Sequence, residues 1–102
     1  MQYIPYGRHD IAEDDVESII KVLRSEWLTQ GPMIPKFEKE LSHIVQSKYA
    51  TAVNSATSAL HIACLALDLE PGDALWTVPN TFVASANCAE YLGANVDFVD
   101  GN

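Results

Sequence analysis

With 102 residues, the chain is long enough for at most one small domain. Its 48% hydrophobic and 20% charged residues are typical of a packed globular chain and argue against disorder. The formal net charge of −8 disfavours nucleic acid or an anionic membrane as a partner, because no basic surface offsets the charge of their phosphates.

The first half of the chain predicts two helices after an extended arm. Residues 1–9 contain proline and glycine and lack periodicity, which predicts the arm. Asp10 and Glu13 resemble a capping pair before apolar residues at helical spacing, so we expect a first helix that ends near Ser25–Trp27. The run Thr29–Pro32 breaks the pattern. A second amphipathic helix follows, with one apolar face formed by Phe37, Leu41, Ile44 and Val45.

Strands and helices alternate in the second half. We expect strands at Tyr49–Val53, Ala74–Val78 and Val96–Val99, with helices at Thr57–Leu67 and Phe82–Leu92 between them. Alternation of this kind predicts an α/β fold with a parallel sheet, here two leading helices followed by β-α-β-α-β.

The cysteines and the longest uncharged stretches favour a cytoplasmic protein. Cys64 and Cys88 lie in apolar helical patterns without metal-ligand spacing, and no signal peptide precedes them. We expect both to be reduced and buried, with no metal site. The uncharged stretches Tyr49–Leu67 and Ala74–Ala89 are interrupted by polar and turn residues, so we expect no membrane span.

The run Asn54–Leu60 joins an expected strand to an expected helix. Small and hydroxyl-bearing residues there leave backbone N–H groups uncovered at the positive end of a helix dipole, which suits a phosphate. A helix cap by Ser55 or Thr57 explains the same pattern without any ligand. The run lacks the glycine-rich patterns of ATP and dinucleotide sites, so a phosphate bound there would be a small, single one.

An ordered set of motifs resembles one family. These motifs are Pro5-Tyr6-Gly7-Arg8, Glu26-Trp27-Leu28-Thr29-Gln30-Gly31-Pro32, Phe37-Glu38, Asn54 to His61, Pro71-Gly72-Asp73, Thr81-Phe82-Val83-Ala84, Leu92-Gly93-Ala94 and Phe98-Val99-Asp100. Together they resemble the N-terminal part of the DegT/DnrJ/StrS sugar aminotransferases, which use pyridoxal 5'-phosphate (PLP). The resemblance implies the large domain of fold type I, the aspartate aminotransferase-like fold. Residues 1–102 would then form a single incomplete domain.

The resemblance also implies a cofactor site and a substrate site. The backbone amides of Ala56 and Thr57, with the Thr57 hydroxyl, would hold the PLP phosphate. Phe82 would stack on the pyridine ring, although a core position at a helix start explains this residue without the family. Tyr6 and Thr29 would lie near the sugar-nucleotide substrate.

Within the family, the chain looks most like the transaminase of pseudaminic acid synthesis. Such an enzyme transfers an amino group from glutamate to the 4-keto group of a UDP-linked 6-deoxy-N-acetylhexosamine. The family implies a homodimer for the complete protein.

The lysine that forms the Schiff base with PLP is expected beyond residue 102. The chain has only Lys21, Lys36, Lys39 and Lys48, on or beside the first two helices, and none matches the family's position. We therefore expect no catalytic residue here and an inactive isolated chain. The resemblance also implies that strands supplied later in the sequence separate the first strand from the other two, so we expect the isolated chain to be marginal, aggregation-prone or dependent on a partner. The alternatives are a non-catalytic remnant and a small autonomous phosphate-binding α/β module.

Overall fold

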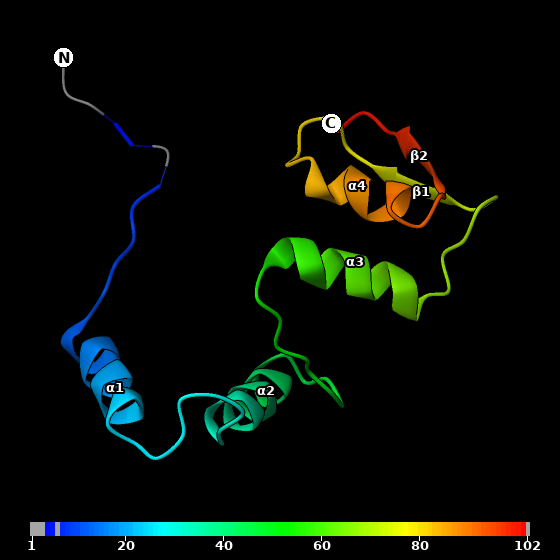
Figure 1. The fold of residues 1–102 in the computed structure, drawn as a ribbon. Coiled ribbons are helices and arrows are strands. Elements are labelled where there is room, and N and C mark those ends of the chain that lie inside the picture. Colours follow the sequence, from blue (N-terminus) through cyan, green and yellow to red (C-terminus); the bar gives the residue numbers. More distant parts are fainter. Residues whose placement is uncertain (1–3, 6, 102) are drawn as a thin grey trace. The chain divides into compact units, whose positions relative to one another are not determined.

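The computed structural model describes residues 4–5 and 7–101. It divides the chain into two compact units, Met1–Ala52 and Val53–Asn102, which we call the first and second units. Figure 1 shows helices alone in the described part of the first unit, and both helices and strands in the second. Residues 4–5 and 7–12 form no helix or strand, and the remainder of the expected arm, residues 1–3 and 6, lies outside the described residues.

The first helix, α1, spans Glu13–Leu23. Its cap differs from the expected pair of Asp10 and Glu13: the Asp15 carboxylate accepts a hydrogen bond from the backbone N–H of Ala12 at 3.0 Å. Glu13 is already the first helical residue, so the N-cap is Ala12 and not Asp10. The capping carboxylate therefore belongs to Asp15, two residues after the expected Glu13. The helix ends before the expected Ser25–Trp27.

The second helix, α2, spans Met33–Ile44 and begins directly after Pro32. Its expected apolar face is present but open to solvent, since Phe37 is 57% exposed and Ile44 is 74% exposed. Neither α1 nor α2, both wholly within the described residues, has a buried residue. The described part of the first unit therefore has amphipathic helices without a hydrophobic core of its own.

The strand expected at Tyr49–Val53 is not formed, so this prediction was wrong. A strand needs a neighbour to take its backbone hydrogen bonds, and no described strand pairs with this segment. The backbone N–H of Ala52 instead donates to Oε1 of Glu38 on α2 at 2.8 Å. The Glu38 carboxylate thus accepts the hydrogen bond that a neighbouring strand would otherwise accept from the Ala52 N–H.

The second unit contains a two-stranded parallel sheet. Helix α3 spans Ala56–Ala66, strand β1 Ala74–Thr77, helix α4 Ala84–Glu90 and strand β2 Asn95–Phe98. Leu75 pairs with Val96 and Thr77 with Phe98 in parallel register. Parallel pairing of the second and third expected strands is therefore confirmed, with α4 as the crossover helix that packs on both strands.

The core of the second unit is small and lies around α4. Helix α3 packs against α4, and the buried apolar residues are Cys64, Ala84, Cys88, Ala89 and Ala94. Gly93 stops α4 with φ of 73°, and a Cβ at this position would approach Cγ of Pro71 to 3.2 Å. None of the helices in the described part of the chain is long and apolar enough to cross a membrane.

Candidate functional site

A hydrogen-bond network organises the start of α3. Ser55 is the N-cap, and its Oγ accepts a hydrogen bond from the backbone N–H of Ser58 at 3.2 Å. The Ser58 hydroxyl donates to Oδ1 of Asn54 at 2.7 Å, and the two serine oxygens lie 3.1 Å apart. Because the Ser58 hydrogen is engaged by Asn54, the Ser55 hydroxyl can donate to Ser58. These three side chains therefore bond to one another and to the backbone.

The network leaves three donors uncommitted. The backbone N–H groups of Ala56 and Thr57 have no acceptor among the described residues, and neither does the Thr57 hydroxyl. Thr57 is half-buried, whereas Ala56 is exposed. Orphan amides at a helix N-terminus carry partial positive charge and can bind an anion. The structure thus leaves free the donors that the sequence assigned to a phosphate.

The charge around this helix start is unusual for an anion site. No acidic residue lies in the first turn of α3, so its dipole is not compensated locally. All six Lys and Arg residues lie in residues 1–52, so residues 53–102 contain six Asp and Glu and no Lys or Arg. Within the second unit, an anion at α3 would therefore be held by amides and hydroxyls and not by an ion pair.

Phe82 lies between β1 and α4 and is exposed. Its carbonyl accepts the first backbone hydrogen bond of the turn that leads into α4, from Ser85 N–H at 3.0 Å. The ring is 74% exposed, so the alternative of a core position is wrong for this residue in the described chain. An exposed aromatic ring after the carboxyl end of a parallel strand is available to a ligand.

The structure brings Phe82 and the start of α3 to the same end of the second unit. Figure 1 shows that α3 and α4, which pack against each other, both begin at this end. The three predicted cofactor residues Ala56, Thr57 and Phe82 therefore come from neighbouring helix starts. This end combines free amides, a free hydroxyl and an exposed aromatic face.

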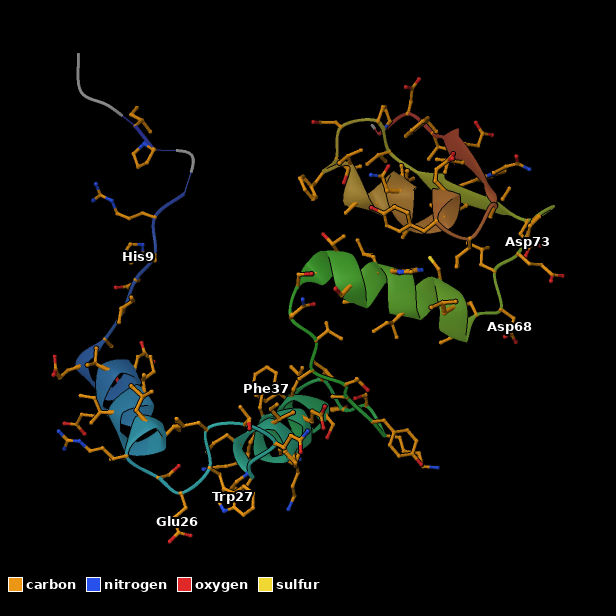
Figure 2. All side chains as sticks on the ribbon, viewed as in Figure 1. His9, Glu26, Trp27, Phe37, Asp68 and Asp73 are labelled. Carbon is orange, nitrogen blue, oxygen red and sulfur yellow. The ribbon has the colours of Figure 1, made fainter. Side chains whose placement is uncertain are left out.

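The predicted substrate residues lie elsewhere. Tyr6 is outside the described residues. Thr29 is an exposed residue in the loop between α1 and α2. It lines a groove of about 320 Å³, and Trp27 and Gly31 also line this groove. A Cβ at Gly31 would lie only 2.7 Å from the Trp27 Cβ, so the close approach of this loop to itself requires glycine. Figure 2 shows the Trp27 side chain at this loop.

No group in the described second unit could act as a catalytic amine. Every lysine of the chain lies in the first unit, and Lys21 is paired with Glu17 on α1 at 3.7 Å. Among the described residues, no cluster of three or more His, Cys, Asp or Glu side chains could hold a metal ion. The second unit therefore offers no lysine amine that could form a Schiff base with a ligand at this end.

Sequence reasoning missed two supporting roles. Asn54 and Ser58 fix the Ser55 cap through their side-chain oxygens, and Glu38 holds Ala52 two residues before this turn begins. The sequence could have indicated the role of Asn54 and Ser58, since Asn and Ser at a strand-to-helix turn commonly bond to nearby backbone and side chains. Nothing in the sequence indicated that Glu38 would reach a segment 14 residues away.

Helices packed on two parallel strands define a small α/β protein, in which a helix start with free amides lies at the same end as the start of α4. Residues 9–102 match the model of the DegT/DnrJ/EryC1/StrS aminotransferase family, and the chain belongs to this family. The family is PLP-dependent, which confirms the cofactor that the resemblance implied.

Similar proteins support the same assignment. The chain is 39% identical over 98 residues to the spore coat polysaccharide biosynthesis protein SpsC of Bacillus subtilis, covering 96% of this chain and 25% of SpsC. It is 41% identical over 97 residues to the UDP-4-amino-4,6-dideoxy-N-acetyl-beta-L-altrosamine transaminase of Campylobacter jejuni, covering 95% of this chain and 26% of that protein. The chain thus spans about a quarter of the length of these relatives.

Solved structures show that the fold is shared as well. The putative sugar aminotransferase Spr1654 of Streptococcus pneumoniae, in its PLP form, matches with a TM-score of 0.88 and 33% identity, covering 97% of this chain and 25% of that one. NtdA of Bacillus subtilis, with bound PMP (pyridoxamine phosphate), matches with a TM-score of 0.79 and 38% identity, covering 90% of this chain and 22% of NtdA.

Proposed function

We propose that this chain is the N-terminal segment of a PLP-dependent aminotransferase that transfers an amino group from glutamate to a 4-keto-6-deoxy sugar nucleotide. The product would serve surface-polysaccharide or pseudaminic acid biosynthesis in the cytoplasm. Both units would belong to one large domain that is completed by further polypeptide, and the complete enzyme would be a homodimer. The isolated chain would be inactive.

The observation that carries the proposal is the free pair of amides at the start of α3. A PLP phosphate is bound mainly by several hydrogen-bond donors. The backbone N–H groups of Ala56 and Thr57 and the Thr57 hydroxyl supply three donors that no described residue uses. Ser55 is engaged in capping and so keeps the first turn in place without competing for the ligand. These residues therefore fit the cofactor's phosphate.

Phe82 would hold the cofactor's ring. Its exposed side chain offers a flat apolar surface two residues before α4, which begins at the same end of the second unit as α3, and stacking would fix the plane of the pyridine ring. When bound, PLP supplies the electron sink that amino transfer requires. The chain's own residues would contribute binding and orientation.

The substrate assignment rests on the relatives and on two residues. The Campylobacter jejuni relative is named as a transaminase of a UDP-linked amino sugar, and SpsC is named for polysaccharide biosynthesis. Tyr6 and Thr29 would contact the sugar nucleotide, Thr29 from the groove of the α1–α2 loop. The choice of the pseudaminic acid pathway depends on the motifs around Tyr6 and Thr57.

The chain alone would lack the Schiff-base lysine, because none of its four lysines matches the position that the family resemblance implies. The second unit contains no lysine, and its surface exposes large apolar side chains, including Leu67 at 79%, Trp76 at 69% and Phe98 at 54%. Exposed apolar residues in this number favour coverage by further polypeptide. They support the view that activity requires the remaining three-quarters found in the relatives.

A chimeric enzyme tests the proposal. The matching N-terminal segment of the Campylobacter jejuni transaminase would be replaced by this chain, and amino transfer from glutamate to that enzyme's keto-sugar nucleotide would be followed by mass spectrometry. We expect turnover by the chimera and none by this chain alone. A chimera that folds and shows the absorbance of bound PLP, yet transfers no amino group, would contradict the proposed activity.

A second candidate function is phosphate binding without catalysis. The start of α3 favours this function, because its free backbone amides need no lysine to bind an anion. In that case the isolated chain would bind PMP, which carries the phosphate but cannot react with surface lysines. The chimera would then bind PLP and remain inactive.

A further inference from the structure

The two cysteines meet in the core of the second unit. Cys64 is the single buried residue of α3, at 6% exposure, and Cys88 is one of three buried residues of α4, at 2%. Because α3 packs against α4, these buried side chains face the same interface. Both cysteines are free thiols.

The two cysteines are neighbours in the interface between α3 and α4. The Cys88 thiol donates to the Ser85 carbonyl oxygen at 3.4 Å, within its own helix. Burial, followed by the neighbouring Cys88 side chain, raises the pKa of the Cys64 thiol, which agrees with the two side chains lying close together where α3 packs on α4. The Cys88 hydrogen is engaged on its own helix, and its sulfur can still accept a hydrogen bond.

The surroundings of the pair are small and apolar. Ala84 and Ala89 are the other buried residues of α4, and Ala94 follows that helix. His61, one turn before Cys64, packs its ring edge-to-face on Tyr91 with the centroids 5.3 Å apart. A disulfide requires the two sulfurs to approach to the S–S length of about 2.05 Å, and small neighbours obstruct that approach less than bulky ones would.

We propose that Cys64 and Cys88 are a modification site that forms a reversible intramolecular disulfide. With glutathione disulfide as oxidant, the thiolate of one cysteine attacks a glutathione sulfur and releases one glutathione thiol. The other cysteine then attacks the protein sulfur of the mixed disulfide and releases the second glutathione. The oxidant gains the two electrons that the protein thiols lose, and two glutathione thiols are produced per protein disulfide.

The disulfide would connect the two helices that begin at the candidate site. It would close a loop from residue 64 to residue 88, which contains Phe82, and would tie α4 to the helix that begins at Ala56. Oxidation would therefore restrict relative movement of the two helix starts. This consequence for cofactor binding rests on the proposed function, whereas formation of the disulfide does not.

The test is an equilibrium with glutathione. The full chain would be held in mixtures of reduced and oxidised glutathione, quenched with acid, and analysed by intact-mass spectrometry and peptide mapping, in native buffer and in concentrated guanidinium chloride. If the fold brings the sulfurs together, we expect the effective concentration of the two thiols to be at least about tenfold higher in native buffer than in denaturant. Non-reducing size-exclusion chromatography would show that the product is a single chain.

The single variants Cys64→Ala and Cys88→Ala are the matched controls. Each would form only the mixed disulfide with glutathione. An effective concentration in native buffer equal to or below that in denaturant would overturn the proposal, as would a product that links two chains. This result is independent of PMP binding and of amino transfer by the chimera, so the disulfide and the proposed function can fail separately.

Discussion

Helices α1 and α3 have the same length, 11 residues, but begin in opposite ways. The first turn of α1 contains Glu13, Asp14 and Asp15, and the Asp15 carboxylate bonds to the backbone of Ala12. The first turn of α3 contains no acid. The start of α1 already carries the negative charge that a helix dipole favours, whereas the start of α3 leaves that position to a ligand.

The comparison gives a physical reason why an acidic chain could hold a phosphate, as we propose. Overall charge acts over distance and is screened by salt, but the donors at a helix start act at contact. An anion meets carboxylates at α1 and uncommitted N–H groups at α3. The first turn of a helix, and not the charge of the chain, therefore determines which helix start can bind.

The largest effect should follow from giving α3 the first turn of α1. Thr57→Asp removes the free hydroxyl and places a carboxylate beside the bound phosphate. We expect the affinity for PMP to fall at least about tenfold, because like charges repel at short distance where screening is weak. Titration followed by NMR would measure this loss, with pyridoxamine as the ligand that lacks the phosphate.

The matched control for this variant is Leu67→Asp. It makes the same change in charge at the other end of α3, where Leu67 is 79% exposed. We expect PMP affinity to stay near that of the parent chain. An equal loss in both variants would mean that net charge matters and that the contrast between the two helix starts does not.

Removal of the Phe82 ring should have a smaller effect on the same site. Phe82→Ala would lower PMP affinity by about three- to tenfold, since a stacked aromatic pair contributes roughly 0.5–1.5 kcal/mol. Because the ring is 74% exposed, the free energy of unfolding should change little. Phe98→Ala removes an exposed ring from β2 and should leave PMP binding unchanged, whereas equal losses would argue against stacking by Phe82.

The two helix caps should differ in their contribution to stability. Ser55→Ala breaks the bonds to Ser58 and should lower the free energy of unfolding by about 1 kcal/mol, measured by chemical denaturation. Asp15→Ala should have a smaller effect, because α1 retains two acids in its first turn and buries no residue. Ser18→Ala, which removes only a bond to the Asp14 carbonyl, is the control. Equal losses at both caps would contradict the contrast.

Local patterns predicted much of the second unit. Ser55 was one of two expected caps for the helix that begins one residue later, and the alternation of expected strands and helices predicted two strands that pair in parallel. These signals depend on residues close together in sequence. Ala56 and Thr57 were assigned from the family resemblance, and their role in binding the cofactor stays a prediction.

Features that depend on distant partners could not be predicted. Tyr49–Val53 has the composition of a strand, but a strand requires a neighbour, and Glu38 takes the Ala52 donor instead. Likewise, no periodicity distinguishes a core Phe82 from an exposed one, because its exposure depends on what packs around α4. Thr29 was assigned from the family's motif, and its role stays a prediction.

The smallest effect concerns the interface behind the two helix starts, where α3 meets α4. Burial, with a further contribution from the adjoining Cys88, raises the pKa of the Cys64 thiol above its ordinary value of 9.0. A raised pKa means that the folded chain favours the protonated thiol, so this contribution to stability is complete below pH 9.0 and is lost as pH rises through the higher folded value. The free energy of unfolding of the reduced chain should therefore decline above pH 9.0, and Cys64→Ala should flatten that decline. An unchanged slope in the variant would show that other groups cause the alkaline loss, and that the packing of α3 on α4 does not depend on the state of this thiol.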